Sequence, residues 1–266
     1  MPSIHVSKCA DPAIKLAHRI AEVVRSKPNC VLGLATGSTP IPVYQELARL
    51  HREEGLDFSQ VRTFNLDEYA GLPPTHDQSY RFFMEEHLFS KVNIKPENVH
   101  FLNGMASDYE KECERYEQEL KAIGPCDVWL LGIGHNGHIA FNEPGSPRDS
   151  RTRVVCLTQS TIDANARFFG NDKSKVPTKA LSVGIATIME SREILLLATG
   201  ESKREAVTKS VKGKCETHCP ASFLHEHPHC RFYVDMDAGK EVDSTCCQAT
   251  NQASCCGSTS CHAAKA

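Results

Sequence analysis

The chain has no apolar run that approaches the roughly 18 residues of a membrane-spanning helix, and its N-terminus lacks the basic-then-apolar layout of a signal peptide. It also lacks an excess of positive charge, because 30 basic residues stand against 33 acidic ones, for a formal net charge of −3. Such a chain offers no basic field to nucleic acid or to an anionic membrane. We therefore expect a cytoplasmic protein that binds neither.

Cysteine, in contrast, is abundant, with 13 residues in 266. Without a secretion signal, we expect mostly free thiols in a reducing cytosol. Five of them lie in a Ser-, Thr- and Ala-rich C-terminal stretch without apolar periodicity, so we interpret 1–240 as one folded domain and 241–266 as a disordered tail. A metal site in the tail is the alternative, but the spacing is not that of paired C-x₂-C knuckles. We interpret the Cys and His residues of 215–230 as structural.

Apolar patterning before the tail alternates between strand and helix periods. We predict strands over 30–35, 61–66, 99–102, 127–133, 153–158, 180–184, 194–198 and 231–235, and helices over 12–26, 40–54, 78–91, 108–122 and 160–169 and from 202 onward. Alternating strands and helices favour a mostly parallel sheet with helices on both faces. The fold class predicted is therefore a single doubly wound, Rossmann-like α/β domain.

The most informative segment follows the predicted strand at 127–133. The strand ends in glycines and leads to Asn136, His138 and Glu143 within a few residues. Strands of this kind end at the ligand-binding face of an α/β sheet, where glycine lets substrate approach the backbone. His138 and Glu143 are typical of a base and its orienting carboxylate. The alternative is a polar turn, which would need neither the second His nor the Asn-Glu-Pro that follows.

Two other predicted strands end in polar residues. The strand at 61–66 stops at Asp67 and Glu68, which are either functional carboxylates or helix caps and turn residues. The strand at 30–35 runs into Thr36-Gly37-Ser38-Thr39-Pro40, where we predict Thr39 as a helix cap and Pro40 in the first helical turn. Hydroxyls and backbone N–H groups at a helix start outline an anion site, although no Gly-Lys-Ser/Thr of a Walker loop follows.

Four motifs together resemble the glucosamine-6-phosphate deaminase family over about Ile4 to Asp237. They are 36–40, Phe64-Asn65-Leu66-Asp67-Glu68-Tyr69, the run 134–144 and Ser150-Arg151-Thr152-Arg153, in the family's order. The resemblance implies an enzyme of amino sugar catabolism that converts glucosamine 6-phosphate and water to fructose 6-phosphate and ammonia. It implies ring opening, C2-to-C1 proton transfer and ketimine hydrolysis, with no cofactor and no metal. The partner is then a small-molecule sugar phosphate, and a homo-oligomer is compatible with it.

The resemblance also implies a role for each candidate residue. His138 matches the ring-opening base, Glu143 the carboxylate that orients it, and Asp67 the proton carrier between C2 and C1. Asn136 stands where many members carry Asp; an amide cannot act as a base, so it can only hold a hydrogen-bonding position. For substrate binding, the family's phosphate contacts correspond here to Thr36, Gly37, Ser38, Thr39, Arg167 and Lys203.

Two other functions remain as alternatives. The 6-phosphogluconolactonases resemble this fold and share a Gly-x-Gly-x-x-Gly-His loop, here 132–138. Against a lactonase, Phe141-Asn142-Glu143-Pro144 and the acidic pair at 67–68 belong to the deaminase pattern. A non-enzymatic sugar-phosphate sensor would predict a fused DNA-binding helix pair and lost acid–base residues, and the sequence has neither feature.

Overall fold

The computed structural model describes residues 4–245, and within them a parallel sheet forms the centre of the molecule. The sheet has seven strands in the order β1-β10-β9-β6-β2-β3-β5, and each neighbouring pair is parallel. Its strands are β1 (His5–Lys8), β2 (Val31–Leu34), β3 (Arg62–Asn65), β5 (Val99–His100), β6 (Val128–Leu131), β9 (Glu193–Ala198) and β10 (Cys230–Val234). Every residue of β2 and β6 is buried, which explains their continuous apolar sequences.

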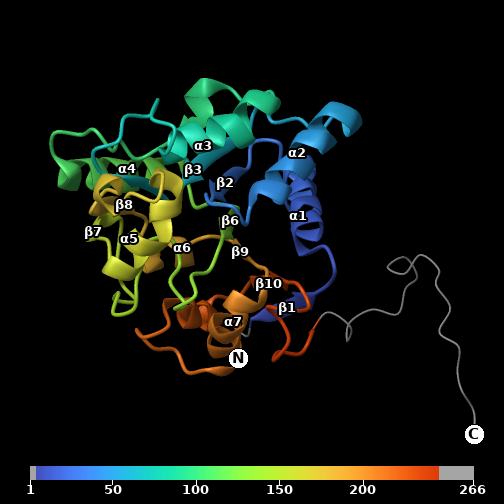
Figure 1. Ribbon diagram of the computed structural model, residues 1–266. Coiled ribbons are helices and arrows are strands. Elements are labelled where there is room, and N and C mark those ends of the chain that lie inside the picture. The colour runs from blue at the N-terminus through green and yellow to red at the C-terminus, as the bar shows by residue number, and fades with distance from the viewer. Residues whose placement is uncertain (1–3, 246–266) are drawn as a thin grey trace, which may run out of the picture.

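Helices pack around this sheet, as the alternating pattern predicts. They are α1 (Pro12–Ser26), α2 (Ile41–Glu54), α3 (Tyr80–His87), α4 (Tyr109–Ile123), α5 (Gln159–Asn165), α6 (Ile185–Met189) and α7 (Arg204–Lys212). Helix α1 packs against α2 and against β9 and β10, at the flank of the sheet opposite to α5 (Figure 1). The doubly wound α/β fold is thus confirmed. None of the helices in 4–245 is long and apolar enough to cross a membrane.

A second sheet, which the sequence pattern did not reveal, stands beside the first. It is antiparallel, in the order β4-β8-β7, with β4 (Asp67–Tyr69), β7 (Arg153–Cys156) and β8 (Lys179–Ser182) (Figure 1). The strands predicted at 153–158 and 180–184 therefore do not join the parallel sheet. The residues of β7 are half-exposed or exposed, in contrast to a strand inside a parallel sheet, which is covered on both faces.

The last described residues are packed against the first strand. Val242 is 1% exposed, and the Thr245 hydroxyl accepts a hydrogen bond from the Val6 amide at 2.8 Å. The Thr245 amide in turn donates to the Val6 carbonyl at 2.9 Å. Residues 241–245 thus cover the free edge of β1. The remainder of the predicted tail, 246–266, lies outside the described residues.

This packing predicts different stabilities for two truncated chains. A chain that ends at Thr245 should unfold at the temperature of the full chain, because the sequence of 246–266 offers no apolar face. A chain that ends at Lys240 should be less stable by about 2 kcal/mol, since it loses a buried valine and two hydrogen bonds to the β1 edge. Thermal and urea unfolding of both truncations measures the difference. Equal stability of the two would contradict the packing of 241–245.

Candidate active site

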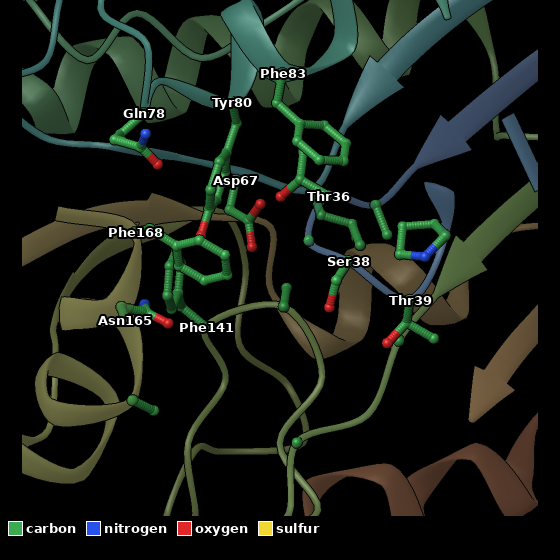
Figure 2. Close-up of a pocket in the computed structure, with 18 of the residues that line it drawn as sticks. Thr36, Ser38, Thr39, Asp67, Gln78, Tyr80, Phe83, Phe141, Asn165 and Phe168 are labelled. Carbon is green, nitrogen blue, oxygen red and sulfur yellow. The ribbon is translucent and has the colours of Figure 1, made fainter. Parts of the chain in front are cut away.

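A cavity of about 470 Å³ lies where the loops after β2, β3 and β6 converge. Its wall includes the 35–41 loop, Asp67 and the 132–140 loop, and it is completed by residues of α3, of α5 and its extension, and by Lys203. Figure 2 shows Asp67 pointing into the space between Tyr80, Phe141 and the loop that carries Thr36 and Ser38. Convergence at the carboxyl ends of parallel strands is the usual location of a ligand site in this fold class.

The two adjacent acids that follow β3, Asp67 and Glu68, have different surroundings. The Glu68 carboxylate accepts hydrogen bonds from the backbone amides of Tyr80 and Arg81, both at 3.0 Å, and so satisfies the first turn of α3. The Asp67 carboxylate faces the cavity, and no residue within 4–245 donates a hydrogen bond to it or forms an ion pair with it. Glu68 therefore supplements the N-cap of α3, Ser79, whereas Asp67 is the carboxylate available for chemistry.

The surroundings of Asp67 disfavour its charged form. Asp67 is 7% exposed, and burial, with repulsion from Glu68, raises the pKa of its carboxyl to about 8. A carboxyl with such a pKa can both take up and release a proton near neutral pH.

The glycines of the 132–138 loop allow the His138 ring to lie against the backbone. A Cβ on Gly134 would lie 2.3 Å from Cε1 of His138, so any larger residue would displace the ring. Gly137 has a φ of 85°, and its added Cβ would lie 2.5 Å from Sγ of Cys219. The cysteine is thus a packing contact of the loop, which agrees with the structural interpretation of the Cys and His residues in 215–230.

His138 and Glu143 meet on one wall of the site. Nδ1 of His138 lies 3.4 Å from Oε2 of Glu143, which is long for a hydrogen bond, and that nitrogen is buried without an aligned partner. Asn136 donates from Nδ2 to the same Oε2 at 2.8 Å, and its Oδ1 accepts the His138 amide at 3.2 Å. The side chains predicted from sequence at 136, 138 and 143 are therefore neighbours.

The Glu143 carboxylate is held in its ionised form. Burial by itself would raise its pKa, but His138, with hydrogen bonds from Thr161 and Asn136, outweighs this effect and lowers the pKa to about 2. Asp67 and Glu143 thus differ by about six pKa units, from about 8 to about 2, although both belong to the same site. Such a separation suits one carboxyl to proton transfer and the other to fixed negative charge.

The 36–39 loop differs from its predicted geometry. Helix α2 begins at Ile41, Pro40 occupies the N-cap position in helical backbone, and no side chain caps the helix. The prediction that Thr39 is the cap was wrong, because the chain turns one residue later than its sequence suggests. No hydrogen bond among residues 4–245 uses the backbone N–H of Gly37, Ser38 or Thr39, and Figure 2 shows the side chains of Ser38 and Thr39 beside the cavity.

Two cations complete this end of the cavity. Lys203 directly precedes α7, and Arg167 lies in the short 3₁₀ helix after α5, with its guanidinium 4.5 Å from the centre of the Phe168 ring. Neither forms an ion pair with another residue of the described chain. Burial, followed by repulsion from Arg167, lowers the pKa of Lys203. Two uncompensated cations and free N–H groups that line the same cavity are chemically suited to an anion.

Sequence reasoning missed the side chains that α3 and α5 bring to this site. Tyr80 and Phe141 stack with an interplanar angle of 10° beside Asp67, and Asn165 donates to the Tyr69 hydroxyl at 2.8 Å. Thr161 donates its hydroxyl hydrogen to Oε1 of Glu143. Tyr80, Thr161 and Asn165 come from helices α3 and α5, which are distant in sequence from the strand ends. A threonine at 158, the N-cap of α5, is the kind of sequence signal that could have located the start of that helix.

Comparison with known proteins decides the family. A family model described as glucosamine-6-phosphate isomerases/6-phosphogluconolactonase matches residues 7–232. The chain belongs to this family. It is 99% identical over 266 residues, all of both chains, to glucosamine-6-phosphate deaminase 1 of Giardia intestinalis. It is 47% identical to glucosamine-6-phosphate deaminase of Thermoanaerobacter pseudethanolicus, over 86% of this chain and 90% of that one.

A solved structure shares the fold of this family member closely. It is described as a monomeric glucosamine-6-phosphate deaminase of the NagB superfamily, with a TM-score of 0.88 and 45% identity. The match covers 90% of this chain and 100% of that one. The resemblance drawn from four motifs is therefore confirmed at the level of the family and the fold.

The raised pKa of Asp67 predicts a pH-dependent stability. An aspartate in the unfolded chain has a pKa of about 3.9, whereas that of folded Asp67 is about 8. Between these values the folded protein holds a proton that the unfolded chain has released, so the free energy of unfolding falls as the pH rises. Asp67→Asn should remove this fall and be more stable than wild type at pH 8. Urea unfolding across this pH window measures it, with the exposed Asp149→Asn as control; parallel curves for wild type and Asp67→Asn would contradict the prediction.

Proposed function

We propose that this chain is a glucosamine-6-phosphate deaminase, which converts glucosamine 6-phosphate and water to fructose 6-phosphate and ammonia. The observation that carries the proposal is one cavity lined by an unneutralised carboxyl, Asp67, by His138, which lies against Glu143, and by two uncompensated cations. The names of the relatives that are 99% and 47% identical support the same activity. The phosphate fits the end that holds Lys203 and Arg167, with the N–H groups and hydroxyls of Thr36, Gly37, Ser38 and Thr39.

Ring opening is the first step. His138 takes the proton of the anomeric hydroxyl and delivers it to the ring oxygen as the bond between that oxygen and C1 breaks, which leaves the open-chain aldehyde. The positive charge that develops on the imidazole lies beside Glu143, whose low pKa keeps it ionised at all working pH values. Asn136 holds the carboxylate and the His138 backbone together and moves no proton itself.

Isomerisation is the second step. Asp67, in its deprotonated form, takes the proton from C2 while a proton of the substrate's ammonium group passes to the C1 oxygen, which gives the enolamine. Asp67 then returns its proton to C1. The product is a ketimine at C2, to which water adds, and ammonia leaves to give the ketone of fructose 6-phosphate. The aromatic rings of Tyr80 and Phe141 around Asp67 exclude water from the carbons that exchange the proton.

The lactonase alternative is less well supported by this site. Hydrolysis of a sugar lactone needs an activated water and a phosphate contact, but no proton carrier between two carbons. The buried Asp67 would then carry the free-energy cost of its raised pKa without a function. The deaminase reaction gives Asp67 a function, as the proton carrier between C2 and C1.

Location and assembly extend the proposal. We infer a cytoplasmic enzyme whose partner is a small sugar phosphate. Because a relative of known structure is described as monomeric, the homo-oligomer considered from the sequence needs a direct measurement. Light scattering coupled to gel filtration gives the mass in solution, to be compared with the chain mass of 29.4 kDa.

The activity itself is tested with pure protein and glucosamine 6-phosphate. Ammonia and fructose 6-phosphate should appear in equal amounts, and a chelator should not stop the reaction. Asp67→Asn should lose about 10²–10⁴-fold in kcat with substrate affinity largely kept, because the amide has the shape of the carboxyl without its basicity. Rapid hydrolysis of 6-phosphogluconolactone without ammonia release from the amino sugar would overturn the proposal in favour of the lactonase.

The role of Asn136 gives a separate prediction. Asn136→Asp should retain activity within about tenfold near pH 8, where a rate factor of ten corresponds to about 1.4 kcal/mol. At acidic pH it should lose more activity than wild type, since a second carboxyl 2.8 Å from Glu143 raises the pKa of the pair and makes it take up a proton. The pH profile of kcat/KM measures this shift. A profile that overlays the wild-type profile would contradict it.

A further inference from the structure

The two oxygens of the Glu143 carboxylate have separate sets of partners. Oε2 faces His138 Nδ1 at 3.4 Å and accepts the Asn136 amide at 2.8 Å. Oε1 accepts the hydroxyl of Thr161, which lies 18 residues further along the chain, in helix α5. Both side chains are buried, with exposures of 9% for Glu143 and 7% for Thr161. The Thr161 hydroxyl is thus the contact that occupies the oxygen turned away from the histidine.

The hydrogen bonds around Thr161 fix the direction in which its hydroxyl points. Thr158 is the N-cap of α5, and its Oγ1 accepts the backbone amide of Thr161 at 3.2 Å. The Thr158 hydroxyl hydrogen is donated to Oγ1 of Thr161 at 3.1 Å. A hydroxyl carries one hydrogen, and Thr161 already accepts from Thr158, so its own hydrogen is directed to Glu143. Helix α5 therefore presents a preset donor to the carboxylate.

We propose that Thr161 is a positioning residue for ring opening: its hydroxyl anchors Oε1 of Glu143 and thereby keeps Oε2 aimed at Nδ1 of His138. The inference rests on the proposed deaminase function and adds to it a residue that touches no reacting atom. The carboxylate has free rotation about its last side-chain bond unless both oxygens are held. With Oε1 released, the Glu143 carboxylate can turn away from the imidazole. The His138 ring is then no longer held in one tautomer and one orientation.

This anchor supports a catalytic step and does not support substrate binding. Thr161 lines the same cavity, but the phosphate contacts lie in the 36–39 loop and at Arg167 and Lys203. Loss of the Thr161 hydroxyl should therefore lower kcat and leave KM nearly unchanged. A displacement of about 1 Å in a catalytic group can cost roughly 10²-fold in rate, so the loss expected here is about 10- to 100-fold.

The test compares Thr161→Val, which keeps the shape and removes the hydroxyl, with Thr161→Ser, which keeps the hydroxyl. We expect kcat to fall about 10- to 100-fold in the first and to stay within about threefold of wild type in the second. The KM of both should stay within about threefold. If Thr161→Val fails to fold, Thr161→Ala removes the same donor with a smaller side chain and serves the same comparison.

Thr187→Val is the matched control. Its hydroxyl donates to Oε1 of Glu117, so the same substitution removes a hydroxyl–carboxylate hydrogen bond outside the cavity. We expect this variant to lose thermal stability and retain wild-type kcat. Equal kcat values for Thr161→Val and Thr187→Val, or a Thr161→Val variant that raises KM alone, would overturn the positioning role.

A double-mutant cycle separates action through Glu143 from a direct role. In a Glu143→Gln background, Thr161→Val should cause little further loss, because the carboxylate that it positions is already gone. Additive losses would show that Thr161 acts independently of Glu143 and would also overturn the proposal. Failure of the proposed function looks different, since the wild-type protein itself would then release no ammonia from glucosamine 6-phosphate.

Discussion

The backbone of Leu66 joins the two sheets, and the geometry of the site depends on it. Its amide donates to the Leu34 carbonyl at 3.1 Å, which continues the pairing of β3 with β2 in the parallel sheet. Its carbonyl accepts a hydrogen bond at 2.8 Å from the amide of Val183, the residue that follows β8 of the antiparallel sheet. Because the amide and the carbonyl of the buried Leu66 both form hydrogen bonds, the next residue, Asp67, is fixed at the junction. The carboxyl therefore enters the cavity from a rigid backbone.

This junction also marks the boundary of what the sequence could predict. The parallel strands were recognisable from their apolar runs, except for β1, which was not predicted. The convergence of their carboxyl ends brought the segments at 36–39, 67–69 and 134–143 together as expected. The antiparallel pairing of β4 with β8 joins segments more than a hundred residues apart, and no local pattern encodes it. The site residues on strand ends were thus predictable, whereas Tyr80 and Thr161, supplied by helices, were not.

The unpaired charges at the cavity lower the stability of the folded protein. Within residues 4–245, the buried Asp67 carboxyl has no hydrogen-bond or ion-pair partner, and Lys203, which is repelled by Arg167, forms no ion pair. Elsewhere the buried acids are satisfied; Asp127, for example, accepts hydrogen bonds from Lys27 and from the Val31 amide, each at 2.8 Å. A carboxyl left unpaired among aromatic rings destabilises the fold, and a ligand that carries an anion at one end and an exchangeable proton near Asp67 offsets that cost when it binds.

The short separation of His138 and Glu143 along the chain still requires a special turn to bring their side chains together. Ala140 adopts a φ of 49°, a left-handed conformation that costs a non-glycine residue about 1 kcal/mol or more. The Asn142 side chain holds the turn, because its Nδ2 donates to the carbonyls of Ile139 and Val183, both at 2.9 Å. Arg153 of β7 donates to Oδ1 of the same amide at 2.8 Å, so both amide hydrogens and the amide oxygen of Asn142 form hydrogen bonds. The mutual position of His138 and Glu143 is therefore set by a strained turn, which Arg153 of β7 and Val183, the residue after β8, hold through Asn142.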